Sequence, residues 1–176
     1  MEFEILGDEP DGPTLELDYR EFAYAGKFVM SSTGKSVARA DGDVVGAVAF
    51  SEDHSDPGAV RLRYVTVRED RRGEGVGARL LRFTAAALAD RYDRVLIAVN
   101  NPIAYQSCYR AGFAFTGEET GIAELLLSYG PDGDRSTEMF QTGLQTFETR
   151  DLPEAQRAVV ADHSDGEPPP VVDVPA

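Results

Sequence analysis

Two arginines followed by glycines at alternate positions form the stretch of this chain best suited to chemistry, Arg71-Arg72-Gly73-Glu74-Gly75-Val76-Gly77. Glycine lets a backbone approach a ligand closely, and the first N–H groups of a helix have no acceptor inside the helix. These groups bind anions because the helix dipole is positive at that end, and the arginine guanidinium matches the geometry of phosphate. We infer that the turn binds a phosphate-bearing ligand, and we expect a diphosphate.

A strand and a helix must flank this turn to position it. Residues 62–67 form a β-branched and aromatic run bounded by charged residues, which favours a buried strand. From Val76 to Leu88 the apolar residues recur at helical spacing. The turn therefore lies between the end of a strand and the start of an amphipathic helix.

Two well-known phosphate motifs fit this chain poorly. The Walker form needs four residues between its first glycine and Gly-Lys-Ser/Thr. Seven residues separate Gly26 from Gly34-Lys35-Ser36, so we reject it. The dinucleotide fingerprint is met in its alanine form by Gly73, Gly75 and Ala78. However, these glycines do not come directly off the strand, and no acidic residue ends the next strand.

A third form, R-x-x-G-x-G, is met by Arg72, Gly75 and Gly77. Together with the strand, the loop length and the helix, this stretch resembles the coenzyme A loop of the GNAT superfamily, the acetyl-CoA-dependent N-acyltransferases. The resemblance covers residues 1–130. It implies an α/β (α+β) fold with a mixed, mostly antiparallel twisted sheet of about six to seven strands and helices on both faces. A central parallel βαβ unit would splay to form a V-shaped cleft for coenzyme A.

The resemblance also implies that acetyl-CoA is the co-substrate and that no metal takes part. The candidate cofactor-binding residues are Val65, Thr66, Val67, Arg71, Arg72, Gly73, Gly75, Val76, Gly77, Ala78 and Asn101. The backbone of residues 65–67 is expected to pair with the pantetheine arm as if the arm were an added strand. A backbone N–H there would stabilise the oxyanion of a tetrahedral intermediate.

A second strand and helix follow the first pair. Residues 94–100 form a compact apolar run, which predicts a buried strand parallel to the first, because a helix connects the two. Asn101 and Pro102 predict the start of another helix, and Gly112 predicts its end.

This second helix carries the candidate catalytic residues. The stretch resembles the second GNAT motif, N-x-x-A-x-x-x-Y-x-x-x-G-F, and the matching residues are Asn101, Ala104, Gly112 and Phe113. The position of the motif's tyrosine, the usual acid for the departing thiolate, is occupied by Cys108, and Tyr109 comes one residue later. Three alternatives stay open: Tyr109 donates the proton through a shifted helix, Cys108 donates it, or neither does and the positioning of the two reactants suffices. Either side chain could instead be part of the core.

Arg61 and Arg63 are the candidate acceptor-binding residues. Strand alternation places both on the face of Val65 and Val67, where they could bind a carboxylate or phosphate of the acceptor. The alternative is that they lie at the exposed start of the strand and pair with acidic neighbours. Some members of the family that modify proteins carry a glutamate base at the position of Arg61, and its absence favours an acidic acceptor.

A capping-box spacing of Asp18 and Glu21 predicts a helix that begins near Tyr19. Four aromatic residues occur in this region, Tyr19, Phe22, Tyr24 and Phe28. Two interpretations stay open: they pack on the sheet, or one or two of them line the pocket for the acceptor.

The composition restricts the partners. The chain has 176 residues, 31 of them acidic and 17 basic, and a net charge of −14, which argues against nucleic acid and anionic membranes. A single cysteine and two histidines indicate neither a disulfide framework nor a metal site, and we interpret His54 as solvated. The first residues lack the pattern of a signal peptide, so we expect none, and no apolar run approaches the roughly 20 residues of a membrane helix. We therefore expect a soluble, cytoplasmic protein.

The remaining segments complete three expected parts: an N-acetyltransferase domain (1–130), a C-terminal helical extension (131–163) and a flexible, acidic, proline-rich tail (164–176). Within the first, Asp41-Gly42 predicts a hairpin between residues 36–39 and 44–50. The two amphipathic helices of the extension either cover the sheet or form a homodimer contact.

Together these features predict an enzyme, an N-acetyltransferase. It would move an acetyl group from acetyl-CoA to a primary amine of a small-molecule or peptide acceptor, by direct transfer in a ternary complex. The amine must be neutral to attack, and an anionic acceptor is favoured. The alternatives are a non-catalytic acyl-CoA-binding or regulatory domain and, from the dinucleotide fingerprint, a nucleotide-dependent oxidoreductase.

Overall fold

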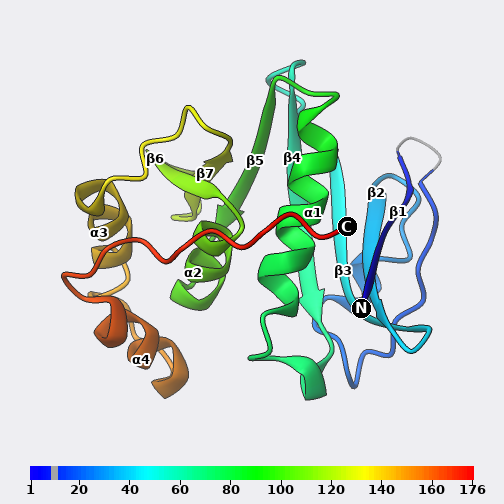
Figure 1. The fold of residues 1–176 in the computed structure, drawn as a ribbon, viewed down its shortest axis with the longest axis horizontal. Coiled ribbons are helices and arrows are strands. Elements are labelled where there is room, and N and C mark those ends of the chain that lie inside the picture. The colour runs from blue at the N-terminus through cyan, green and yellow to red at the C-terminus, as the bar shows by residue number, and fades with distance from the viewer. Residues whose placement is uncertain (9–11) are drawn as a thin grey trace. The chain divides into compact units, whose positions relative to one another are not determined.

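The computed structural model describes residues 1–8 and 12–176, which form two compact units (Figure 1). The first unit comprises Met1–Val95 and Asp173–Ala176, and the second comprises Leu96–Val172. In chain order the elements are β1 (Glu2–Gly7), η1 (Ala25–Lys27), β2 (Gly34–Ala40), β3 (Asp43–Glu52), β4 (Ala59–Val67), η2 (Glu69–Arg71), α1 (Val76–Ala89), β5 (Arg94–Val99), α2 (Pro102–Arg110), β6 (Phe113–Glu119), β7 (Leu125–Tyr129), α3 (Thr137–Gln145) and α4 (Glu154–His163). The seven strands and the helices of the described residues confirm the predicted mixed fold.

The strands of the first unit run in the order β1-β2-β3-β4, and each neighbouring pair is antiparallel. The hairpin between β2 and β3 turns at Asp41 and Gly42, with φ of 52° and 86°. Positive φ at both central residues is typical of the type I′ turn, whose twist matches that of the strands. This confirms the hairpin predicted from the Asp-Gly pair.

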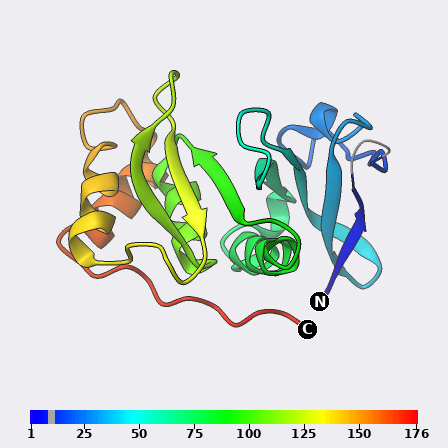
Figure 2. The same ribbon diagram turned by 90° about the horizontal axis from the view of Figure 1, so that it is seen from above.

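Helix α1 packs against one face of these strands, and Figure 2 shows it nearly end-on beside them. The helix approaches β3 closely at Gly46, where an added Cβ would lie 3.2 Å from Leu80 Cδ2 and 3.3 Å from Val76 Cγ1. The hydroxyls of Ser36 and Thr84 form a buried hydrogen bond between β2 and α1. The start of α1 is thereby held against the sheet.

Part of the chain between residues 12 and 33 packs on the opposite face. Phe28 is fully buried there against Val37, Ala47 and Ala49. The helix predicted from Tyr19 is wrong: the segment forms turns and the short helix η1.

The capping box fails because the Asp18 carboxylate has other partners. Its Oδ1 accepts from the backbone N–H of Arg20 at 2.9 Å, and both of its oxygens accept from the Arg20 guanidinium, at 3.0 and 2.9 Å. The carboxylate therefore forms a local turn with its near neighbour and does not cap a helix.

The strands of the second unit lie in the order β5-β7-β6, and β6 and β7 form an antiparallel hairpin. Asn101 caps α2 as predicted, because its Oδ1 accepts from the N–H of Ala104 at 2.9 Å. Ser136 caps α3 in the same way, accepting from the N–H of Met139 at 3.1 Å. In both helices the side chain satisfies an N–H that has no acceptor within the helix.

An aromatic cluster forms the core of the second unit. Tyr105 of α2 packs against Phe140 and Phe147, so the apolar side of the C-terminal helices covers this unit. The end of α4 and the residues just after it are hydrogen-bonded to α3. The Gln141 amide donates to the carbonyls of His163 and Gly166, at 2.7 Å in each case. No helix of the described residues is long and apolar enough to cross a membrane.

Gly143 of α3 lies against Tyr105, and we predict that Gly143→Ala lowers the free energy of unfolding by about 1–3 kcal/mol. An added Cβ would lie 2.7 Å from Tyr105 Cζ and 2.9 Å from Phe115 Cδ2, and both rings are buried. Replacing glycine with alanine in an exposed helix normally raises the free energy of unfolding by about 1 kcal/mol. The change predicted for Gly143→Ala therefore has the opposite sign. Urea unfolding measures the change, with Gln145→Ala on the exposed side of α3 as control; a stabilised Gly143→Ala would contradict the packing.

Candidate functional site

The glycine turn has the backbone geometry that an anion site requires. Gly73 and Gly75 adopt φ of 82° and 79°, a region that glycine enters without steric cost. Gly75 is the N-cap of α1, and the first hydrogen bond of the helix runs from Arg79 N–H to the Gly75 carbonyl at 3.2 Å. The amides of residues 76–78 therefore precede the hydrogen-bonded ladder and lie at the positive end of the helix dipole.

Packing within the protein does not require glycine at either end of the turn. An added Cβ on Gly73 would meet nothing within 4 Å, and one on Gly77 would meet only Val67 Cγ2, at an ordinary 3.5 Å. The absence of side chains at these positions leaves space beside the free amides, as the approach of a ligand to the backbone requires.

The arginines near the turn differ in their partners. Arg71 pairs with Glu74 at 2.9 Å, and Arg68, which the sequence analysis did not single out, pairs with Asp70. Arg72 is exposed and donates from Nε to the Val67 carbonyl at 3.2 Å, and it makes no ion pair with a described residue. Its guanidinium is therefore the one beside the turn that is most available to a phosphate.

The backbone of residues 65–67 pairs with β3 along one edge of β4. Thr66 is 4% exposed, and its Oγ1 has no hydrogen-bond partner among the described residues. Binding of a pantetheine arm by this stretch stays a prediction.

A β-bulge in β4 places Arg61 on a different face from the one that the sequence predicts. The register with β3 shifts so that Arg63 is the extra residue. A bulge breaks the two-residue alternation of side chains, so Arg61 lies on the face of Tyr64 and not on that of residues 65 and 67. The prediction that both arginines share the latter face is wrong for Arg61.

Both candidate acceptor-binding arginines have partners within the first unit. Arg61 Nη2 lies 3.0 Å from Asp53 Oδ2, which is the acidic pairing that the sequence left open. Arg63 donates from Nε to Ser51 Oγ at 2.8 Å and from Nη2 to the Glu52 carbonyl at 3.1 Å. These contacts tie the start of β4 to the end of β3.

Asp53 is the most strongly perturbed carboxylate of this region. Hydrogen bonds from the Ser55 backbone N–H and hydroxyl, together with Arg61, lower the pKa of the buried Asp53 carboxyl to about 2. It is therefore ionised at neutral pH and holds the loop after β3.

Cys108 and Tyr109 are both buried on α2. Burial raises the pKa of the Cys108 thiol to about 12. Burial also raises the pKa of Tyr109, whose hydroxyl accepts from the Phe115 N–H at 2.9 Å. The Tyr109 ring centroid lies 5.0 Å from that of Tyr105 and 4.8 Å from that of Phe140. These surroundings match the alternative in which the two side chains belong to the core.

The candidate residues are divided between the two units. Residues 61–78 lie in the first, whereas Asn101, Cys108 and Tyr109 lie in the second. The side chain of Asn101 caps α2. Within the described residues no group of three or more His, Cys, Asp or Glu could hold a metal ion.

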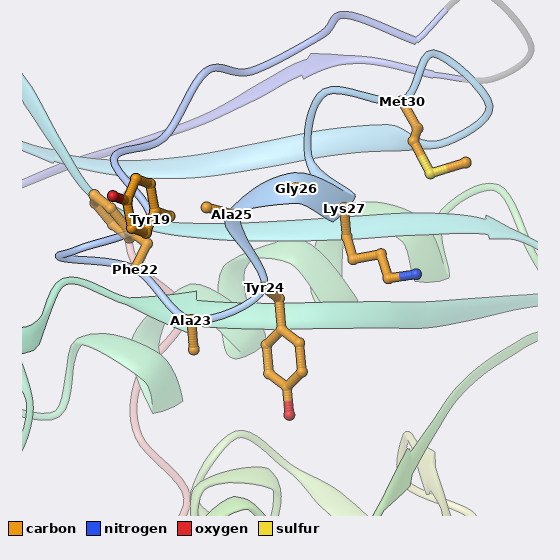
Figure 3. A pocket seen from close by; sticks show the side chains of 8 residues that line it. All are labelled: Tyr19, Phe22, Ala23, Tyr24, Ala25, Gly26, Lys27 and Met30. Carbon is orange, nitrogen blue, oxygen red and sulfur yellow. The ribbon is translucent and has the colours of Figure 1, made fainter.

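An open pocket of about 600 Å³ lies around η1 in the first unit, and we call it the η1 pocket (Figure 3). It is lined by Tyr19, Phe22, Ala23, Tyr24, Ala25, Gly26, Lys27 and Met30. Of the four aromatic residues predicted to pack on the sheet or to line a pocket, Phe28 packs in the core and the other three line this pocket. The sequence analysis did not single out Lys27 as a site residue.

Comparisons with known proteins extend this description. The model of the acetyltransferase (GNAT) family matches residues 3–113. A comparison with curated proteins found no match.

Among solved structures, a nourseothricin acetyltransferase is 24% identical, with a TM-score of 0.47, and the match covers 55% of this chain and 64% of that one. An IAA acetyltransferase from Bacillus cereus is 23% identical, with a TM-score of 0.44 and coverages of 55% and 77%. A ribosomal-protein-alanine N-acetyltransferase from Brucella melitensis is 19% identical, with a TM-score of 0.47 and coverages of 55% and 67%. The matched part thus spans less than two thirds of the nourseothricin acetyltransferase.

The low pKa of Asp53 predicts a pH-dependent contribution to stability. A carboxylate whose folded pKa is depressed stabilises the fold above its unfolded pKa and loses that effect as the pH falls through the folded value, here about 2. Asp53→Asn should therefore lower the free energy of unfolding by about 1–2 kcal/mol at pH 7, and the difference from wild type should shrink in acid below pH 4. Urea unfolding across this range tests it, with the exposed Asp132→Asn as control; a constant difference would contradict the assignment.

Proposed function

Because the chain belongs to the acetyltransferase (GNAT) family, we propose that it transfers an acetyl group from acetyl-CoA to a primary amine of a small-molecule or peptide acceptor. The observation that carries the proposal is the family match over residues 3–113, which includes the whole glycine turn. The geometry of that turn supports it independently, because free amides, two left-handed glycines and Arg72 converge on one end of α1.

The residues present fit coenzyme A. The amides at the start of α1 and the guanidinium of Arg72 would hold the diphosphate, and the backbone of β4 would hold the pantetheine arm. Bound acetyl-CoA supplies the acetyl group as a thioester that an amine can attack. The protein's own contribution is to hold this donor and a neutral amine together, which is already a large rate effect. We also propose that the protein is cytoplasmic and that it forms a homodimer.

We propose that neither Cys108 nor Tyr109 protonates the departing thiolate. Both are buried, and the Tyr109 hydroxyl lies inside the core, where it accepts from the Phe115 N–H. These observations support the third alternative, in which neither residue donates and the thiolate takes its proton from water. They also support a second candidate function, a non-catalytic acyl-CoA-binding domain, which thiol release in the presence of varied amines would exclude.

We predict that Arg72→Ala raises the Kd for coenzyme A about five- to tenfold, because one charge-assisted phosphate contact is lost. Isothermal titration calorimetry measures the change, and raised salt should reduce the difference between the variant and wild type. Arg91→Ala is the matched control, since Arg91 pairs with Asp8 beyond the other end of α1. If coenzyme A fails to bind wild type at millimolar concentration, the proposed function is wrong.

For Tyr109→Phe and Cys108→Ala we predict a kcat within about tenfold of wild type, well short of the loss expected from removing a general acid. Tyr109→Phe should nevertheless lower the free energy of unfolding by about 1–3 kcal/mol, because the buried Phe115 N–H loses its acceptor. Steady-state kinetics and urea unfolding on the same samples separate the two effects. A hundredfold fall in kcat in one variant would identify that residue as the acid after all.

A further inference from the structure

The η1 pocket is lined by several large, exposed side chains with apolar surface. Tyr19 is 81% exposed, Tyr24 57% and Met30 51%, and all three line the pocket. Large exposed apolar side chains that gather around one hollow are typical of a ligand site, whereas scattered ones need no explanation. The pocket is therefore suited to a ligand with an apolar or aromatic body.

Tyr24 adopts a backbone conformation that is uncommon for an aromatic residue. Its φ is 60°, in the left-handed region. This conformation directs the ring toward β4, where its centroid lies 5.8 Å from that of Tyr64. Strained backbone of this kind gathers at binding sites, where it fixes a side chain in a position that relaxed backbone would not provide. Here it holds an exposed ring beside a second ring.

Lys27 supplies the pocket with a positive charge. Figure 3 shows its side chain leaving the η1 turn on the same side as that of Tyr24. Its Nζ lies 5.6 Å from the centroid of the Tyr64 ring, and it makes no ion pair with a described residue. Lys27 therefore faces an aromatic ring and not a carboxylate, so its charge is not neutralised by an acidic partner among the described residues. Such a cation attracts an anionic ligand.

The other lysine is fully buried and holds the pocket in place. Lys35 donates from Nζ to the carbonyls of Met30 and Thr33, at 2.6 and 2.8 Å. These bonds fix the chain that carries the Met30 wall of the pocket. Lys27 is thus the lysine that a ligand could reach.

The pocket segment is also attached to the chain that leads into the glycine turn. The N–H of Glu69, just after β4, donates to the carbonyl of Glu21 at 2.9 Å. Tyr64, beneath Tyr24 and Lys27, lies on β4 only three residues before Val67, the last residue of that strand. The same strand end therefore connects the η1 pocket with the proposed donor site.

We infer that the η1 pocket binds the acyl acceptor, and that this acceptor carries a carboxylate held by Lys27 and an apolar or aromatic body held by Tyr24. The inference rests on the proposed function and replaces Arg61 and Arg63, which are engaged with Asp53, Ser51 and Glu52, as the residues that recognise the negative group. Lys27 is then a specificity residue, and it neither moves a proton nor touches the thioester.

Equilibrium binding tests the inference without requiring turnover. The probes are 3-phenylpropanoate and its neutral amide, 3-phenylpropanamide, titrated by calorimetry into protein saturated with coenzyme A. Wild type should bind the carboxylate about five- to tenfold more tightly than the amide, the effect of one partly screened ion pair. Lys27→Met should abolish this preference and Lys27→Arg should retain it. Arg94→Met, which removes the same charge elsewhere on the first unit, should leave it unchanged.

Tyr24→Ala separates the two parts of the site. It should weaken the binding of both probes by a similar factor, about fivefold, because it removes one aromatic wall and leaves the charge. A thermal melt of each variant checks that the fold is retained. The same variants can be compared by thiol release with phenylalanine and phenylalaninamide, where Lys27→Met should lower the ratio of their kcat/KM values.

Two results would overturn the inference. One is a carboxylate preference that persists in Lys27→Met, and the other is the failure of both probes to bind wild type at millimolar concentration. Either result would leave coenzyme A binding and thiol release intact as tests of the proposed function. Conversely, loss of coenzyme A binding would refute the proposed function even if the probes bound.

Discussion

The first turn of α1 depends on the close packing of that helix against β3. Gly46 allows Val76 and Leu80 to approach the strand, and the hydrogen bond between Ser36 and Thr84 joins the helix to β2 farther along. A helix packed in this way keeps the N–H groups of its first turn in a fixed direction relative to the sheet. An anion site made of backbone N–H groups needs such rigidity, because reorganising the groups on binding would reduce affinity.

The distribution of charge leaves few cations for ligands. Each of the seven ion pairs between described residues uses an arginine, including Arg61 with Asp53 and Arg71 with Glu74. In a chain with 17 basic residues and a net charge of −14, these pairs neutralise seven arginines. Arg72 beside the glycine turn and Lys27 in the η1 pocket make no such pair, and each lies where a ligand with negative charge would be bound. The overall negative charge makes a site at an unpaired cation such as Arg72 or Lys27 more selective, because an anion is repelled from other surfaces.

The second unit uses its tyrosines for packing. Tyr105 donates to the Phe140 carbonyl at 2.8 Å, and Tyr109 accepts from Phe115 N–H, so α2 is joined to α3 and β6 through buried hydroxyls. Buried phenols with satisfied hydrogen bonds stabilise a unique core. This packing of Tyr109, the tyrosine one residue after the motif position that Cys108 occupies, supports the proposal that the reaction relies on positioning.

Local chemistry was sufficient to predict many of these features from the sequence alone. The Asp41-Gly42 turn, the cap at Asn101 and the glycine turn before α1 all follow from contacts within a few residues. Other features depend on partners far away in the chain or on packing in three dimensions. The bulge at Arg63 places the Arg61 side chain on the opposite face of the sheet from the predicted one. The bulge arises from the pairing of β4 with β3, and the alternation of residues within β4 alone does not reveal it. The absence of a helix after Asp18 reflects competition between a cap and a nearby guanidinium, and the burial of Tyr109 depends on α3, some 30 residues later in the sequence. Sequence alone thus determined where the backbone would turn and present its amides, whereas only the tertiary structure decided which charged and aromatic side chains remain available to a ligand, because that depends on which of them find partners inside the fold.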